Sequence, residues 1–88
     1  MTKAIYRPEY EVFLEILKRR RLAAGLTQVQ CSQALGRPQS FISDVERGSR
    51  RLDIIQLRDL CQVIGIDLTT LVLELEEALR GGDATNCR

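Results

Sequence analysis

The chain has 88 residues, enough for one small domain with a single core, and its few aromatic residues are two tyrosines and two phenylalanines. The formal net charge of +1 is unevenly spread: residues 1–51 carry ten basic and five acidic side chains, whereas residues 52–80 carry two basic and six acidic ones. This division suggests one face for a polyanion and another turned away from it. With no histidine, no glycine-rich phosphate loop and no nucleophile beside a base, we expect no enzyme and no metal, cofactor or small-molecule ligand.

The three cysteines are Cys31, Cys61 and Cys87, and their spacing fits no zinc or redox motif. Cys31 and Cys61 lie within amphipathic patterns, which favours small buried side chains, with reactive or paired thiols as the alternative. An odd number of cysteines and no signal-peptide pattern favour a reducing cytoplasm. No apolar run approaches the ~18 residues of a membrane span, so we expect none.

Helical periodicity recurs along the chain, and the first helix is predicted to start near Pro8 and to end at Gly25. Its apolar stripe consists of Tyr10, Phe13, Leu14 and Leu17. At about 100° per residue, Arg21 falls about 20° from Tyr10, on the same stripe. Because an unpaired buried charge is costly, Arg21 needs a partner there unless its side chain extends to solvent.

Two short helices follow. Thr27 is expected to cap the first, which runs to about Leu35 with Val29, Cys31, Ser32 and Leu35 facing inward. Gly36 breaks it. Pro38 suits the first turn of the next helix, about residues 38–46, where Ile42 and Val45 face inward and Gly48 ends the helix.

The acidic half of the chain predicts two further helices, capped by Asp53 and Asp67. The fourth helix closes at Gly65, and its apolar face is Ile54, Leu57, Cys61 and Ile64, flanked by Leu60. The fifth has a wide apolar stripe of Leu68, Leu71, Val72, Leu75 and Leu79, with Leu73 outside it. We expect one all-α, five-helix domain over residues 1–80 and a flexible tail over residues 81–88.

Two short helices joined by a tight glycine turn, about residues 27–47, indicate a helix-turn-helix. Over residues 21–66 the chain resembles the phage repressor and Cro family of transcriptional regulators, also called the Xre family. The resemblance rests on spaced matches at Gly25-Leu26-Thr27-Gln28, Gly36, Gln39-Ser40, Ile42-Ser43, Glu46, Gly48, Arg50, Leu57 and Gly65. Cys31-Ser32 and Leu52 depart from the family pattern, and Ser32 is tolerable if its hydroxyl bonds back to its own helix.

The resemblance implies specific roles for named residues. It pairs Arg21 with Glu46 as a structural ion pair, and it places the third helix in the major groove of double-stranded DNA. The residues expected to face the bases are Gln39, Ser40, Ser43 and Asp44. Those expected to contact the DNA backbone are Gln28, Arg37, Arg47, Arg50 and Arg51, with Gln28 also steadying Gln39.

Two interpretations of individual side chains stay open at this point. Phe41 either packs inward or presses on a thymine methyl group. Lys18, Arg19 and Arg20 either form a solvated helix face or approach phosphate groups.

The largest open question is the assembly. The resemblance implies a sequence-specific regulator, a repressor or autoregulator similar to restriction–modification controllers or antitoxins. We expect a homodimer on a palindromic operator, formed through Leu68, Leu71, Val72, Leu73 and Leu75. The alternative for the fifth helix is that it only completes the core of a single chain. The alternative is a protein-interaction module that keeps this fold without binding DNA.

Overall fold

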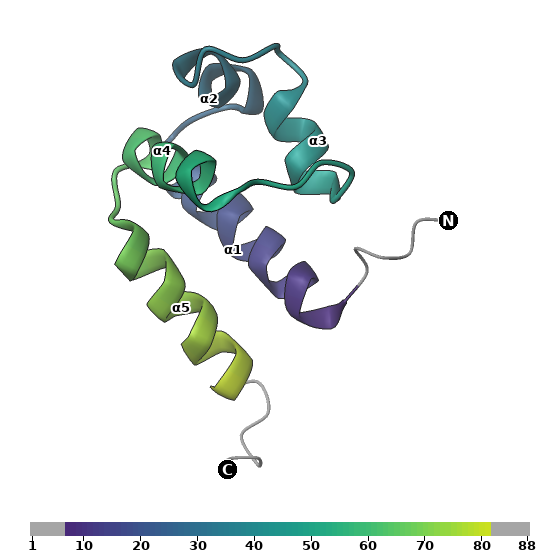
Figure 1. Cartoon of the computed structure of the whole chain (residues 1–88). Coiled ribbons are helices and arrows are strands. Elements are labelled where there is room, and N and C mark those ends of the chain that lie inside the picture. Colours follow the sequence, from purple (N-terminus) through teal and green to yellow (C-terminus); the bar gives the residue numbers. More distant parts are fainter. Residues whose placement is uncertain (1–6, 82–88) are drawn as a thin grey trace.

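The computed structural model describes residues 7–81, and these residues form five helices without a β-strand (Figure 1). In chain order the helices are α1 (Pro8–Ala23), α2 (Gln28–Ala34), α3 (Phe41–Arg47), α4 (Ile54–Ile64) and α5 (Leu68–Gly81). The predicted all-α, five-helix fold is confirmed. The last helix includes Gly81, the first residue of the predicted tail, while residues 82–88, with Cys87, lie outside the described residues.

The helix ends follow the expected capping chemistry. Thr27 forms a capping box with Gln30, and Asp53 forms one with Gln56, so that each side chain accepts a backbone N–H and each glutamine returns a bond to the capping residue. Gly48 ends α3 at φ 85°, a left-handed conformation that costs glycine little. Each of these caps involves residues only a few positions apart in the chain, so each can be predicted from the local sequence.

The third helix starts later than predicted. Residues 38–46 were expected to be helical, but α3 begins at Phe41, and the Phe41 N–H donates to the carbonyl oxygen of Pro38 at 2.9 Å. That bond spans three residues, so residues 38–41 form a tight turn instead of a first α-helical turn. Gln39 and Ser40 therefore lie in this turn, directly before the helix.

The hydrophobic core is centred on α1, which contacts both α3 and α5. Ile16, outside the predicted stripe, is fully buried, while Tyr10, Phe13 and Leu14 are only half-buried. Two helices packing on different sides of α1 bury more than one stripe, so its periodicity shows only part of the contact surface. Cys31 and Cys61 are buried in this core as predicted, and burial raises the pKa of both thiols.

Two apolar residues predicted to face inward are exposed. Val29 is 39% exposed and Ile54 is 58% exposed. Both lie in the first turn of a helix, which extends beyond the core that the later turns of α2 and α4 cover. Leu60, predicted only to flank the apolar face of α4, is buried instead.

Ser32 connects α2 to α3. Its side chain is fully buried, and its Oγ accepts a hydrogen bond from the Ile42 N–H at 3.0 Å. The expectation that this hydroxyl bonds back to its own helix is therefore wrong, because the hydroxyl bonds to α3. The Ile42 N–H belongs to the first turn of α3, where backbone donors have no partner within the helix. Ser32 thus caps α3 from the neighbouring helix.

We expect Ser32→Ala to lower the free energy of unfolding by about 1–3 kcal/mol, because it leaves the buried Ile42 N–H without an acceptor. Urea unfolding followed by circular dichroism measures the change. Ser43→Ala is the matched control, since the Ser43 hydroxyl donates to the Ser40 carbonyl at the surface, and it should change stability by less than about 0.5 kcal/mol. Equal effects of the two substitutions would contradict the assigned role of Ser32.

Helix α5 lies beside α1 and is held to it by charge as well as by apolar contacts (Figure 1). Glu74 accepts from Arg20 Nε at 2.7 Å and from Arg19 Nη1 at 3.4 Å. Two of the residues interpreted as a solvated face or a phosphate contact therefore bind an acid of α5. Only Lys18 of that run is left without a carboxylate partner in the described part of the chain.

Only some of the residues predicted to form the dimer interface on α5 are exposed. Leu71 is 1% exposed in the single chain, so it belongs to the core, and its assignment to the interface is corrected. Leu68 and Leu75 are half-buried against the core, whereas Val72 and Leu73 are 44% and 58% exposed. Among residues 7–81, no helix combines the length and the hydrophobicity that crossing a bilayer requires.

Candidate nucleic-acid interface

Helices α2 and α3 pack against each other and are joined by residues 35–40, which turn the chain over the top of the molecule in Figure 1. Phe41, Ile42 and Val45 of α3 are buried. An isolated helix of seven residues is unstable in water, so α3 depends on these contacts and on its ties to other helices. The arrangement is a helix-turn-helix with α3 as its second helix.

The main tie is a buried ion pair between α1 and the end of α3. Arg21 Nε and Nη2 donate to the two carboxylate oxygens of Glu46 at 2.7 Å and 3.1 Å. Both side chains are 8% exposed, and Arg21 Nη1 also donates to the Leu26 carbonyl at 2.8 Å. The hydrogen bonds to Glu46 raise the pKa of Arg21. Arg21 thus has the partner that its place on an apolar stripe required.

Gln28 extends this pair into a network. Its Nε2 donates to Glu46 Oε1 at 2.9 Å, an orientation fixed by the fact that a carboxylate only accepts. The side chain expected to contact phosphate and to steady Gln39 is thus engaged with Glu46 in the free protein. The network joins α1, α2 and α3 through a single carboxylate. Nothing in the local sequence around Gln28 indicates this bond.

The start of α3 presents polar side chains. Gln39 and Ser40 are exposed, and Ser40 is the residue that precedes the helix. Ser43 lies one turn on, half-buried, with its hydroxyl donating to the Ser40 carbonyl at 3.0 Å. The four residues expected to face bases, Gln39, Ser40, Ser43 and Asp44, therefore lie within about one and a half turns of each other.

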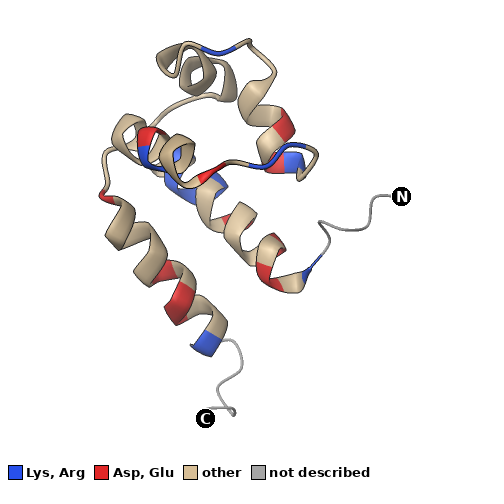
Figure 2. Ribbon diagram, viewed as in Figure 1, with Lys and Arg blue, Asp and Glu red and all other residues tan. Residues whose placement is uncertain are grey.

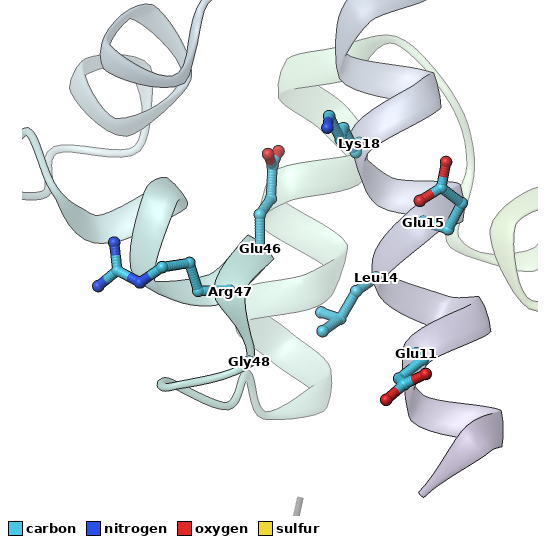
Figure 3. A pocket seen from close by; sticks show the side chains of 7 residues that line it. All are labelled: Glu11, Leu14, Glu15, Lys18, Glu46, Arg47 and Gly48. Atoms are coloured by element: carbon cyan, nitrogen blue, oxygen red, sulfur yellow. The ribbon is translucent and has the colours of Figure 1, made fainter. Parts of the chain in front are cut away.

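The Asp44 carboxylate has a charged partner in the free protein. Its carboxylate forms an ion pair with Arg47, one turn further along α3. The Arg47 side chain points away from α1 (Figure 3), and it is 64% exposed, so the pair can open at little cost. Asp44 and Arg47, expected to contact a base and the backbone respectively, are thus partners in the absence of DNA.

The other three arginines expected to contact the DNA backbone flank the two ends of α3 (Figure 2). Arg37 lies in the turn before the helix, and Arg50 and Arg51 lie in the loop after it. Arg37 and Arg50 both lie over the Phe41 ring, and Arg51 lies over the Tyr10 ring. Phe41 is 5% exposed, so it packs inward and is not available to a thymine methyl group. Acidic residues lie on α5 and on the first half of α1, and α3 itself carries Asp44 and Glu46, both of which are paired with arginines.

A hollow of about 260 Å³ separates the end of α3 from α1 (Figure 3). Its walls include the acidic residues Glu11, Glu15 and Glu46 and the basic residues Lys18 and Arg47. Since the Glu46 carboxylate is already bound by Arg21, the charges on these walls are close to balance, and the hollow has no excess of basic groups for a polyanion. Within residues 7–81, no three acidic or cysteine side chains are grouped so as to hold a metal ion. The basic residues near α3 lie instead in the segments before and after it, at Arg37, Arg50 and Arg51.

A helix-turn-helix with a fixed second helix, polar residues at its start and arginines at both ends defines a DNA-binding protein. Residues 13–75 match the helix-turn-helix domain family. An uncharacterised HTH-type transcriptional regulator, y4dJ, from Sinorhizobium fredii is 36% identical over 59 residues, 67% of this chain and 77% of the relative. The chain therefore belongs to the Xre family of helix-turn-helix proteins and is a DNA-binding transcriptional regulator, which confirms the resemblance.

Solved structures of other helix-turn-helix proteins share this fold. An XRE-family-like protein from Pseudomonas syringae pv. tomato shares 45% identity with a TM-score of 0.76, covering 85% of this chain and 92% of that one. The restriction–modification controller protein C.Esp1396I superposes with a TM-score of 0.74 at 22% identity, covering 83% of this chain and 96% of that one. The second likeness shows a shared fold.

Proposed function

We propose that the protein regulates transcription by inserting α3 into the major groove of an operator and reading its bases with Gln39, Ser40, Ser43 and Asp44. The Arg21–Glu46–Gln28 network carries this proposal, because it fixes α3 to the rest of the domain at a defined angle. Gln39 is suited to a bidentate contact with adenine, and Asp44 to accepting from the N4 amine of cytosine once Arg47 has moved away.

Affinity in this proposal comes mainly from the DNA backbone. Arg37, Arg50 and Arg51 are exposed at the two ends of α3, and Arg47 joins them when its pair with Asp44 opens. Gln28 is included as a backbone contact because its Nε2 carries a second N–H, beyond the one that donates to Glu46, which can donate to a phosphate oxygen. These contacts fix the orientation of the domain on the duplex and carry no sequence information themselves.

We further propose a homodimer on a palindromic operator, with Val72 and Leu73 at the centre of the contact and Leu68 and Leu75 at its edges. One domain of this size buries little DNA, and two domains on half-sites about one helical turn apart supply the missing area. Exposed neighbouring apolar residues on α5, on the acidic half of the chain, support this surface.

The simplest action of such a dimer is repression, including autoregulation, by occluding a promoter, since the described residues form a single domain. The likeness to C.Esp1396I, a restriction–modification controller protein, supports a controller-like role. An antitoxin-like role would use the same DNA binding in another operon. We place this action in the cytoplasm, with the DNA. A protein-interaction module without DNA binding is not favoured by any of the contacts around α3.

Gln39→Ala tests the assignment of base readout. On an operator recovered by selection from random DNA, we expect binding to weaken by about 1–3 kcal/mol, while affinity for random DNA stays unchanged. Gln62→Ala, an exposed glutamine on α4, is the matched control and should leave both affinities unchanged. Fluorescence anisotropy with labelled duplexes measures both. If Gln39→Ala weakened binding to random DNA equally, Gln39 would not read a base.

A further inference from the structure

We propose that Phe41 is a positioning residue for DNA binding: its ring supports Arg37 and Arg50 together, so that both guanidinium groups face one segment of the DNA backbone. This inference rests on the proposed DNA-binding role of α3. It adds a function for a side chain that itself touches neither bases nor phosphate groups, and it makes two backbone contacts interdependent.

The geometry links residues from opposite ends of α3. The Cζ atoms of Arg37 and Arg50 lie 5.2 Å and 5.0 Å from the centroid of the Phe41 ring. Arg37 belongs to the turn that precedes the helix, and Arg50 to the loop that follows it. Both distances are within the range of cation–π attraction, and the ring is 5% exposed. One buried aromatic ring therefore sets the positions of two cations.

The two positive charges beside this ring favour the binding of an anion. Arg20, Arg21 and Arg47 each pair with a carboxylate, whereas neither Arg37 nor Arg50 has such a partner among residues 7–81. Two guanidinium groups on one ring repel each other, and an anion placed between them relieves that repulsion. A phosphodiester backbone supplies such anions, and arginine binds phosphate well because of its fork of donors.

A place for the phosphate groups lies beside the ring. Arg37, Ser40, Phe41 and Arg50 line a hollow of about 200 Å³ together with Pro38 and Asp44. The Asp44 carboxylate is paired with Arg47, which limits its repulsion of an incoming phosphate. Ser40, exposed at the start of α3, adds a hydroxyl donor. The hollow is therefore basic at both sides and adjoins the side chains proposed to read bases.

Support by the ring should increase affinity, because the two arginines are already ordered before DNA arrives. We expect Phe41→Leu, which keeps an apolar side chain but removes the ring, to weaken binding to random and operator DNA alike by about 10-fold, since each freed arginine must be ordered again. Phe41→Tyr keeps the ring and should bind within about two-fold of the wild type. In an Arg37→Ala/Arg50→Ala background, Phe41→Leu should have no further effect.

The experiment is a fluorescence anisotropy titration of a 20-base-pair duplex over a range of salt concentrations, with thermal unfolding of each variant. Arg37→Ala and Arg50→Ala alter exposed side chains, so both should fold, and each should reduce the slope of log affinity against log salt by about 0.9. Unchanged slopes would overturn the inference even if Phe41→Leu failed to fold.

The remaining outcomes separate the two proposals. Wild-type affinity in Phe41→Leu, or an equal loss with and without the two arginines, would overturn the positioning role and leave DNA binding intact. A wild-type protein that binds no duplex at any salt concentration would overturn the proposed function, and this inference with it.

Discussion

Replacing Glu46 with alanine should lower the free energy of unfolding by about 3–5 kcal/mol, because it leaves the guanidinium group of Arg21 buried without its carboxylate. The Arg21 side chain is 8% exposed, and of its three hydrogen bonds only the one to the Leu26 carbonyl would persist. A domain of this size has only about 5–15 kcal/mol of stability in total. The loss should therefore be visible as a large fall in the midpoint of thermal unfolding, followed by circular dichroism.

The matched control is Glu76→Ala, which removes the glutamate of an exposed ion pair with Arg80. That pair has side chains 54% and 76% exposed, and surface pairs of this kind contribute about 0–1 kcal/mol. The contrast between the two variants isolates burial, since each loses one carboxylate. A Glu46→Ala protein that unfolds within a degree or two of the wild type would show that the network does not hold α3 in place.

Leu73→Asp should weaken binding to a palindromic operator by about 100-fold or more, without destabilising the single domain. Leu73 is 58% exposed, so the charge enters no core, but it would face its copy across the proposed dimer contact. Losing that contact removes the gain from binding two half-sites at once, which is on the order of 100-fold to 10,000-fold. Sedimentation velocity should show a dimer for the wild type and a monomer for the variant.

Leu22→Asp is the control for this substitution. Leu22 is 56% exposed on α1, so the same chemical change is made at a similarly exposed leucine on another helix. It should leave the oligomeric state and the operator affinity unchanged. If Leu73→Asp stayed dimeric, or if the wild type were monomeric with and without operator DNA, the proposed dimer surface on α5 would be wrong.

The sequence was sufficient where the structural cause is local. The five helices, the caps at Thr27 and Asp53 and the glycine that ends α3 all depend on residues close together in the chain. The sequence was insufficient where two helices pack against a third. Burial of Ile16 was not predicted, because it results from α3 and α5 both packing on α1. Periodicity describes one face at a time, so it missed this second face.

The same division applies to the candidate site. Arg21 could be predicted because a charge on an apolar stripe requires a partner, and the family resemblance supplied Glu46. The bond from Gln28 to Glu46 and those from Arg19 and Arg20 to Glu74 were missed, because each joins two helices whose separation no local pattern fixes. The shared position of Arg37 and Arg50 on Phe41 was missed for the same reason.

The most direct test of the account measures the affinity of the wild-type protein for random and genomic DNA fragments as a function of salt concentration. Binding through the arginines at the ends of α3 predicts an affinity that falls linearly in log–log form, by about 0.9 per phosphate contact, and a subset of genomic fragments that stays bound at higher salt. Absence of binding at low salt, or an affinity that salt does not change, would contradict DNA recognition by α3.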